Sequence, residues 1–232
     1  MSIQPYYERD GITIYHGDCR EILPQLEPVD LVLTDPPYGS ATHEGARSVT
    51  ATRALVDFAS TTAGELRALM ARLAPMCSRW FVATMEWRHI AELEREPPAG
   101  WHFVRFGIWV KPNGAPQFTG DRPAMGWEGI AMLHRDNTRM YWNGGGRHAV
   151  WTRPKITGDH PTQKPEPLMR EWVRLFSNAG DTILDPFMGS GTTLRAAKDL
   201  GRRAIGIEID ERYVEIAIRR LEQQVLPIGD IA

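Results

Sequence analysis

The chain has 232 residues and a formal net charge of -2, and 42% of its residues are hydrophobic. This length is enough for one large domain with a buried core, and no Gly-, Ser- or Pro-rich linker divides it, so we expect a single domain over residues 1–232. The near-neutral charge excludes a uniformly basic nucleic-acid-binding protein, although it is compatible with a local positive face.

The cysteines and the hydropathy pattern indicate the compartment. Cys19 and Cys77 are too few and too far apart in sequence for a disulfide framework or a zinc site, so we expect reduced thiols and no metal. No apolar run is long enough to span a bilayer, and residues 1–5 do not resemble a cleavable signal. These features predict a soluble, cytoplasmic protein with no membrane partner.

Strands and helices alternate along the first hundred residues. Residues 29–34 form an almost continuously apolar run, which is typical of a parallel strand buried on both faces, and this run ends at Asp35. Residues 40–62 are polar and lack convincing periodicity, so we expect a loop there. The other predicted elements are strands at 12–16 and 79–84 and helices at 20–26, 65–74 and 86–94.

The middle of the chain predicts a different arrangement. The strands predicted at 103–110 and 129–134 are joined by a Pro- and Gly-rich loop without a helix, so we expect them to pair antiparallel. Residues 139–155 interleave aromatic and basic side chains around three consecutive glycines. This composition suits contacts with phosphates and bases, and a twisted surface hairpin explains it equally well.

The last third returns to strand–helix alternation. The helix predicted at 167–176 has an apolar stripe that is typical of a core-facing helix. A glycine turn at 186–191 joins a strand at 182–185 to a helix at 192–200, and this succession is the geometry of a nucleotide-type pocket. The remaining predicted elements are a strand at 203–209 and a helix at 211–225.

A proline-rich turn follows the strand that ends at Thr34. Pro36 and Pro37 favour extended geometry and donate no amide hydrogen, so the side chains of Asp35 and Tyr38 are expected to project from the fold. An ordinary turn with Asp as a cap is the commoner meaning of Asp-Pro. The stretch alone does not distinguish these two interpretations.

The glycine turn indicates the kind of ligand. It does not match Gly-x-Gly-x-x-Gly, which disfavours a nicotinamide-dependent oxidoreductase, and no Lys follows as in a P-loop. Gly189 and Gly191 allow a close approach of backbone to ligand, and Asp185 suits a positively charged group. Glu208 lies where a ribose is usually held. S-adenosylmethionine, with its α-ammonium group, ribose diol and adenine, fits this turn.

Taken together, four motifs closely resemble the β class of DNA amino-methyltransferases, in which Asp-Pro-Pro-Tyr precedes the cofactor motif. The resemblance covers about residues 12–221. It implies an α/β, Rossmann-like S-adenosylmethionine-dependent methyltransferase fold, whose mostly parallel seven-stranded sheet includes an antiparallel hairpin and whose motif order is circularly permuted. It also implies a bacterial, archaeal or phage-encoded enzyme of the restriction-modification type. The motifs are Gly17-Asp18-Cys19, Asp35-Pro36-Pro37-Tyr38, His160-Pro161-Thr162-Gln163-Lys164-Pro165 and Asp185-Pro186-Phe187-Met188-Gly189-Ser190-Gly191-Thr192.

The resemblance also implies a role for each motif residue. It places Asp185 near the methionine part of the cofactor, and Thr162 and Lys164 near its carboxylate. It places Glu208 on the ribose hydroxyls and Asp18 on the adenine amino group. The expected cofactor-binding residues are Asp18, Cys19, Asp35, Thr162, Lys164, Asp185, Phe187, Gly189, Ser190, Gly191, Thr192 and Glu208. The expected catalytic residues are Asp35, Pro36, Pro37 and Tyr38.

The chemistry of an exocyclic amino group agrees with these roles. Its nitrogen is a poor nucleophile and becomes positively charged during attack, so the enzyme should offer acceptors to its hydrogens. The Asp35 carboxylate and the Pro36 carbonyl are such acceptors, and Tyr38 offers a face for a flipped base, since a base within the duplex is out of reach. In the family that the chain resembles, Asp at the first motif position is associated with adenine N6, so adenine is expected and cytosine N4 is the alternative.

Double-stranded DNA is the expected partner, and a homodimer is compatible with the resemblance. Methylation of RNA or of a protein amide is a weaker alternative, as is a catalytically silent DNA-binding subunit. Target recognition is expected from segments at about 40–62, 112–127 and 139–155, which carry basic and aromatic side chains. The candidate DNA-binding residues are Arg47, Arg53, Arg139, Arg147, His148 and Lys155.

Overall fold

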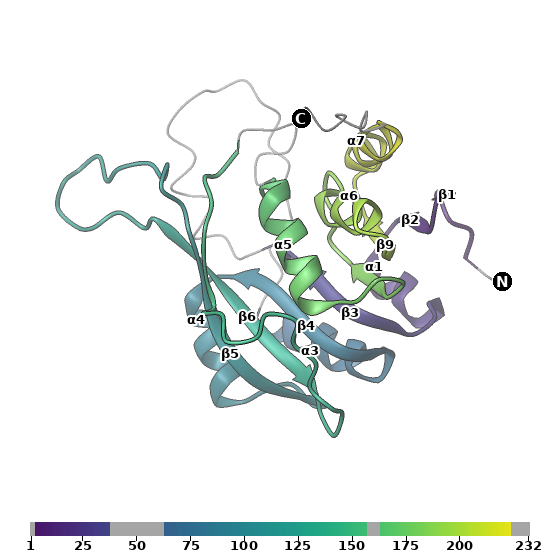
Figure 1. Cartoon of the computed structure of the whole chain (residues 1–232), viewed down its shortest axis with the longest axis horizontal. Coiled ribbons are helices and arrows are strands. Elements are labelled where there is room, and N and C mark those ends of the chain that lie inside the picture. The colour runs from purple at the N-terminus through teal and green to yellow at the C-terminus, as the bar shows by residue number, and fades with distance from the viewer. Residues whose placement is uncertain (1–2, 38–62, 157–162, 224–232) are drawn as a thin grey trace, which may run out of the picture.

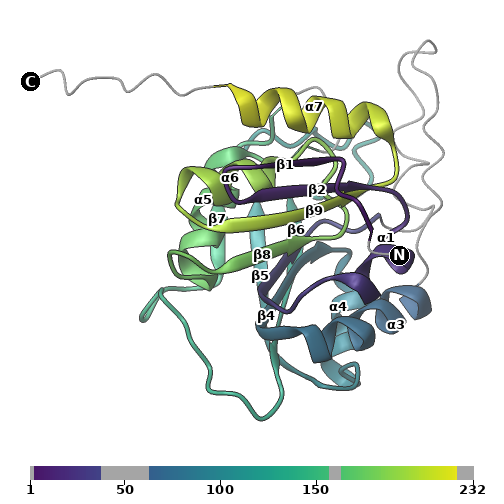
Figure 2. The same cartoon turned by 90° about the vertical axis from the view of Figure 1, so that its right-hand side faces the viewer.

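The computed structural model describes residues 3–37, 63–156 and 163–223 of the chain. Within these ranges a single sheet has the strand order β1-β2-β9-β8-β3-β4-β6-β5-β7, as Figures 1 and 2 show from two sides. The strands are β1 (Tyr7–Arg9), β2 (Ile12–His16), β3 (Val29–Thr34), β4 (Cys77–Met85), β5 (Trp101–Val110), β6 (Trp127–Arg135), β7 (Val150–Thr152), β8 (Thr182–Asp185) and β9 (Arg203–Glu208).

Helices cover both faces of this sheet, as expected for a parallel sheet buried on both sides. In Figure 2, α5, α6 and α7 lie on one side of the sheet and α3 and α4 on the other. None of the helices in the described ranges meets the length and hydropathy needed to cross a membrane. The α-helices are α1 (Cys19–Ile22), α3 (Ala63–Leu73), α4 (Trp87–Arg95), α5 (Glu166–Phe176), α6 (Thr192–Asp199) and α7 (Glu211–Glu222), and the 3-10 helices are η1 (Leu23–Gln25) and η2 (Ala74–Met76).

The alternation of side chains along β3 explains why the sheet has two apolar faces. Leu31 and Leu33 belong to the core cluster that includes Trp172 of α5, whereas Val32 belongs to the cluster that includes Met70 of α3. Successive residues of a strand point to opposite faces, so a continuous apolar run supplies both cores. All three β3 residues are fully buried, and together they hold the end of the strand rigidly between two helical layers.

The sheet has nine strands rather than the seven expected from the sequence. The two additions are β1 and β7, each of three residues, which lie at the two edges of the sheet. The expected antiparallel hairpin is present, because β6 pairs antiparallel with β5. The hairpin interpretation of residues 139–155 is wrong: β7 pairs parallel with β5, with Trp109 opposite Trp151, and closes no hairpin of its own.

The strand directions decide where a site can form. Strands β2, β9, β8, β3 and β4 are parallel, so their carboxyl ends meet at one edge of the sheet, which we call the catalytic edge. Because β6 is antiparallel to β4, β6 begins at this edge, and β5 and β7 end there. Ligands of open α/β sheets bind at the carboxyl ends of parallel strands. A ligand site is therefore expected at the catalytic edge.

Candidate functional site

The two acidic motifs lie side by side on neighbouring strands. Asp35 follows β3, Asp185 ends β8, and these strands pair in parallel, with Leu31 opposite Ile183. The Thr34 hydroxyl donates a 2.7 Å hydrogen bond to Asp185 Oδ1, so the end of one strand is tied to the end of the other. The structure thus brings together two motifs that are 150 residues apart in sequence.

The carboxylate of Asp35 is held by groups from two other segments. The Thr84 hydroxyl, near the end of β4, donates to Oδ1, and the Lys164 ammonium group donates to Oδ2. The Asp35 side chain is 25% exposed, so a ligand has access to it. Pro36 is buried and Pro37 is partly buried, which fixes the backbone direction of the turn. Tyr38, the fourth predicted catalytic residue, lies outside the described residues.

Lys164 lies at the centre of the site. Its side chain is 8% exposed, and its ammonium group contacts Asp35 and, at 3.5 Å, Glu128 Oε1 of β6. Burial lowers the pKa of Lys164, but attraction to Asp35 and Glu128 outweighs burial, and the pKa is raised above its ordinary value. The expected place of Lys164 was beside the cofactor carboxylate, and the contacts that the structure records are with Asp35 and Glu128. Thr162 lies outside the described residues.

The glycine turn between β8 and α6 has the geometry that permits a close approach. Gly189 and Gly191 adopt φ of 50° and 75°, the left-handed region in which other residues are strained. The Gly189 amide donates a 3.0 Å hydrogen bond to Glu208 Oε2, and the Asp210 amide donates at 2.9 Å to Oε1. The turn is therefore bound directly to the end of β9, where the ribose was expected.

Glu208 and Asp18 both act as local caps in the structure. Both oxygens of Glu208 accept backbone amides, and burial raises its pKa. Asp18 caps α1 by accepting the Arg20 amide at 2.8 Å, and its hydrogen bonds with Arg20 lower its pKa. Cys19, which follows, is buried, and burial raises the pKa of its thiol to about 11. A thiol of this kind stays protonated near neutral pH, as expected of a structural residue.

Two further residues of the turn are fixed to the last helix. Ser190 and Thr192 are buried, and Arg220 of α7 donates to both hydroxyls, at 3.0 and 3.2 Å. Arg220 also donates to the Ser190 carbonyl at 2.7 Å. Phe187 is partly buried and packs against the core cluster that contains Ile207. The hydroxyls of the turn therefore hold α7 in place, beside any part they take in ligand binding.

The hydrogen-bond acceptors at the catalytic edge fit S-adenosylmethionine. Asp185, Glu208 and Asp18 are carboxylates at the ends of three neighbouring strands, β8, β9 and β2, and they suit an ammonium group, a ribose diol and an adenine amino group. Gly189 and Gly191 hold the turn beside these carboxylates at positive φ. No cluster of three or more potential metal ligands occurs within the described ranges.

Burial of Asp185 makes the stability of the protein depend on pH. Burial raises the pKa of its carboxyl from 3.8 to about 6, although hydrogen bonds from Thr193 and Thr34 act in the opposite direction. Between about pH 4 and pH 6 the folded protein therefore holds a proton on Asp185 that the unfolded chain has lost. The free energy of unfolding falls as the pH rises through this range, so the ionised carboxylate lowers stability above about pH 6 and has no such effect below about pH 4. A positively charged ligand beside the carboxylate would offset this cost.

We expect Asp185→Asn to remove this pH dependence. Between about pH 4 and pH 7 the free energy of unfolding of the wild type should fall by about 3 kcal/mol relative to the Asn variant. Urea unfolding of both proteins across this range measures the difference. The matched control is Asp199→Asn on α6, which removes the charge of another carboxylate, one that contacts two arginines. A parallel pH course for wild type and Asp185→Asn would contradict the prediction.

Parts of two predicted recognition segments meet at the catalytic edge. Asn113 follows β5 and exchanges two hydrogen bonds with the backbone of Lys155, which follows β7; both are 2.8 Å long. The side chain of Lys155 is exposed. In Figure 1 the segment between β5 and β6 extends well beyond the sheet. The segments expected at 112–127 and at the end of 139–155 therefore form one surface next to the Asp35 turn.

Among the other candidate DNA-binding residues that the structure describes, Arg139 follows β6 at the opposite edge of the sheet. Residues 136–149 return from the end of β6 to the start of β7, where Val150 pairs with Ile108 near the catalytic edge, so only the first part of this segment lies at the opposite edge. Arg139 is exposed there and stacks on Tyr141, with its guanidinium 5.8 Å from the ring centre. Arg147 and His148 are exposed where this segment returns towards β7. Arg47 and Arg53 lie outside the described residues.

A basic groove of about 470 Å³ runs beside α5. Within it, Glu171 binds Arg147 at 2.9 Å and Arg153 at 2.8 Å. Arg170 is paired with Asp199 of α6 at 2.6 Å. Three of its arginines thus carry acidic partners, and the groove leads away from the Asp35 turn along the helix. The lining residues are Arg147, Arg153, Pro167, Arg170, Glu171, Arg174 and Leu175.

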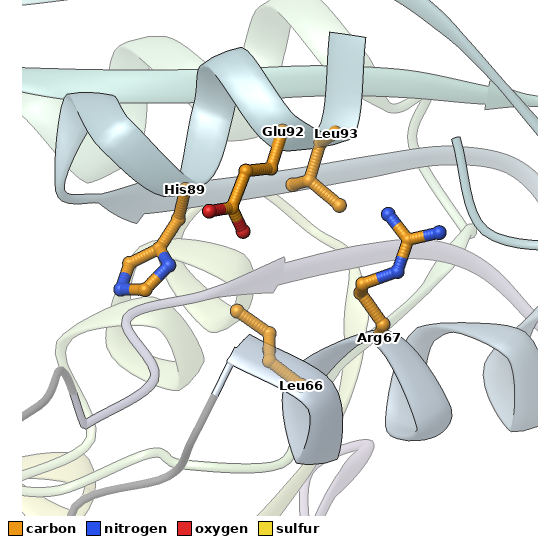
Figure 3. Close-up of a pocket in the computed structure, with 5 residues that line it drawn as sticks. All are labelled: Leu66, Arg67, His89, Glu92 and Leu93. Carbon is orange, nitrogen blue, oxygen red and sulfur yellow. The ribbon is translucent and has the colours of Figure 1, made fainter. Parts of the chain in front are cut away.

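A second cavity lies between α3 and α4, and no candidate site residue lines it. Figure 3 shows its lining, with His89, Glu92 and Leu93 on α4 facing Leu66 and Arg67 on α3. Its volume is about 10 Å³, close to the minimum for one water molecule. Buried His89 Nδ1 has no partner within the described part of the chain. The cavity is too small for a substrate and belongs to the packing of the two helices.

Sequence reasoning missed three residues of the site: Thr84, Glu128 and Lys111. Thr84 lies at the carboxyl end of a predicted strand, so the rule that such ends gather at one edge was the available signal. Glu128 lies at the start of an antiparallel strand, and Lys111 at the end of its partner. Their place at the catalytic edge depends on the strand order, which local patterns do not contain.

Comparisons with known proteins agree with this geometry. The family model of DNA methylases of the N6/N4 type matches residues 134–219. The type II methyltransferase M2.DpnII of Streptococcus pneumoniae is 30% identical over 97% of this chain and 94% of its own length. The solved M1.HpyAVI–SAM complex has a TM-score of 0.73 at 28% identity, covering 91% of this chain and 100% of that one.

The fold is also shared more widely. The cytosine-N4-specific PvuII DNA methyltransferase superposes with a TM-score of 0.72 at 16% identity, over 96% of this chain and 90% of that one. The protein is thus an S-adenosylmethionine-dependent methyltransferase by fold. More specifically, the chain belongs to the N6/N4 DNA methylase family, and DNA is its substrate.

Proposed function

We propose that this enzyme transfers a methyl group to the exocyclic N6 of an adenine flipped out of double-stranded DNA. The observation that carries the proposal is the Asp35 turn, partly exposed at the catalytic edge and hydrogen-bonded through Thr34 to the strand end that bears the glycine turn. In this arrangement, a hydrogen-bond acceptor for the amino group of the target base would lie beside the cofactor pocket. Asp at the first motif position, where the family also uses Ser, supports adenine over cytosine.

The chain's own residues would act mainly by accepting hydrogen bonds. When bound, S-adenosylmethionine supplies a methyl group on a positively charged sulfur. Asp35 and the Pro36 carbonyl accept the two N–H groups of the target amine, and these bonds strengthen as its nitrogen gains positive charge. The cofactor would give its methyl group to the amine nitrogen and be left as a neutral thioether, and the methylated nitrogen would lose one proton to Asp35 or to solvent. We propose that Tyr38 stacks on the flipped base.

Nucleoside analysis of the product tests the proposed base. Purified protein is incubated with methyl-labelled S-adenosylmethionine and unmethylated double-stranded DNA, which is then digested and analysed by mass spectrometry. We expect N6-methyladenine. N4-methylcytosine as the sole product would overturn the choice of adenine, and the fold shared with a cytosine-N4-specific enzyme makes it the second candidate. RNA and protein acceptors in parallel reactions should stay unlabelled.

We propose that the DNA backbone contacts the surface formed around Asn113 and Lys155. Lys155→Ala should weaken DNA binding and reduce the slope of log K against log salt by about 1, because one phosphate contact is lost. Arg72→Ala is the matched control, since Arg72 is also exposed but lies at the end of α3, at the opposite edge. Fluorescence anisotropy at several salt concentrations measures both slopes. Equal slopes for wild type and Lys155→Ala would place the DNA elsewhere.

We also propose a homodimer as the working assembly. The recognition segment at 112–127 is short. A second subunit would therefore enlarge the surface that contacts DNA. Two apolar side chains of the segment at 112–127 are exposed, Phe118 to 87% and Met125 to 62%, and they are suited to a protein or DNA contact. Sedimentation velocity with and without DNA should show a dimer, and a fully active monomer would contradict this part of the proposal.

A further inference from the structure

Four charged side chains of alternating sign form a row from the Asp35 turn to the base of the 112–127 segment. Lys164 contacts Asp35 on one side and Glu128 Oε1, at 3.5 Å, on the other. The second oxygen of Glu128 is 2.9 Å from Lys111 Nζ. These residues come from four separate parts of the chain, which only the fold brings together.

The row is shielded from solvent. The exposed fractions of the side chains are 25% for Asp35, 8% for Lys164, 18% for Glu128 and 24% for Lys111. Trp109 of β5 supplies an apolar floor, with Lys111 Nζ 4.6 Å and Lys164 Nζ 5.9 Å from its ring centre. Charges in such a setting interact more strongly than they do in water, so removing one member changes how its neighbours share their charge.

Glu128 also connects the row to the segment that lies between β5 and β6. Lys111 directly follows β5, Glu128 is the second residue of β6, and their ion pair closes the base of that segment. The Lys111 amide reinforces the closure with a 2.7 Å hydrogen bond to the Gly126 carbonyl. The position of Glu128 is therefore fixed by backbone on both sides.

The sharing of Lys164 has a chemical consequence at Asp35. An ammonium group has three donors, and here they are divided between two carboxylates. If Lys164 were paired with Asp35 alone, it would neutralise more of the charge that Asp35 needs as an acceptor for the target amine. Glu128 takes part of the ammonium charge and so leaves Asp35 a stronger acceptor.

We propose that Glu128 is a positioning residue for methyl transfer: it shares Lys164 with Asp35 and so sets how well Asp35 accepts the hydrogens of the target amine. This inference rests on the proposed role of Asp35. It does not depend on whether the base is adenine or cytosine, because both present an exocyclic amino group. Glu128 itself touches neither the amine nor the cofactor in this scheme.

The test is the single-turnover rate of methyl transfer in Glu128→Gln. We expect the rate to fall at least tenfold, while the dissociation constants for S-adenosylmethionine and for DNA stay within threefold of the wild-type values. A role confined to folding or binding would move those constants or the melting temperature instead. Glu128→Asp keeps the charge at a shorter reach, so its rate should lie between those of the wild type and the Gln variant, at least threefold below the wild type.

Asp199→Asn is the matched control. Asp199 is also a carboxylate shared by two cations, Arg170 and Arg195, and is 13% exposed, but it lies at the end of α6, away from Asp35. Its methyl-transfer rate should stay near that of the wild type. If Glu128→Gln does not fold, Glu128→Asp alone decides the question.

Two results would overturn the inference. One is a rate within twofold of the wild type in a folded Glu128→Gln, or in Glu128→Asp if the Gln variant does not fold. The other is a loss that appears wholly in the dissociation constant for cofactor or DNA. Failure of the proposed function would be distinct, because the wild type itself would then methylate no DNA.

Discussion

Asp35→Ala should reduce methyl transfer by about 10³-fold or more, the effect of removing one preorganised charge-stabilising group from an active site. We propose that the Asp35 carboxylate accepts the hydrogens of the target amine, and Thr84 and Lys164 fix its position. The substitution takes away the acceptor just when the nitrogen gains positive charge. Cofactor affinity should change much less, because the glycine turn, Glu208 and Asp185 stay in place.

The measurement pairs a tritiated methyl-transfer assay with calorimetric titration of S-adenosylmethionine. Asp35→Asn should lose less activity than the Ala variant, since the amide keeps an acceptor oxygen. Asp136→Ala, at the opposite edge and paired only with the part-exposed His102 in the described structure, is the control for loss of an acidic side chain. Because Asp35→Ala leaves Lys164 with less compensating charge, unfolding curves must accompany the kinetics. Turnover at the wild-type rate in the Ala variant would contradict the proposed role of Asp35.

Gly191→Ala should have the second largest effect, a loss of cofactor affinity of at least about 100-fold with lower stability. Gly191 has φ of 75°, and a Cβ there would lie 2.7 Å from Ala217 Cβ and 3.3 Å from its Cα. A left-handed conformation alone costs an alanine about 1–2 kcal/mol. The collision with α7 adds to this, because helix backbone must move, and the turn beside Glu208 would shift with it.

Gly201 offers a closely matched control for this substitution. It has φ of 70°, almost the same as Gly191, and a Cβ there would meet nothing within 4 Å. Gly201→Ala should therefore cost only the conformational term and leave cofactor affinity unchanged. Urea unfolding and cofactor titration of both variants separate strain from collision. Equal effects of the two substitutions would show that the contact with Ala217 is unimportant.

Local patterns in the sequence predicted the elements well where one physical cause dominates. The apolar run at 29–34 became β3 with the same bounds, and the strand predicted at 182–185 became β8. The glycine turn appeared between β8 and α6 because Gly189 and Gly191 adopt positive φ without the strain that most other residues would carry there. In each case the determining interactions are close in sequence.

The site was predicted less completely because its contacts join segments remote in sequence. The motif predicted that Lys164 belongs to the site, but its contact with Asp35 crosses 129 residues. Arg139 looked as suitable for DNA as Lys155 by composition, yet Arg139 follows the end of β6 at the opposite edge, whereas Lys155 follows β7, which runs parallel to β5 and ends at the catalytic edge. The direction of β7, a strand of three residues, thus decides at which edge Lys155 lies, and no local signal in the sequence specifies that direction.

The strand order has a consequence for how the chain is made. Strands β2 and β3 are close neighbours in sequence, but β9 and β8 separate them in the sheet. A ribosome that has delivered the first 180 residues has therefore released two hydrophobic strands whose inner edges still lack their partners. Such edges invite aggregation until the last fifty residues emerge. Synthesis should thus be the most chaperone-dependent phase in the life of this enzyme, and premature termination within that stretch should yield insoluble fragments.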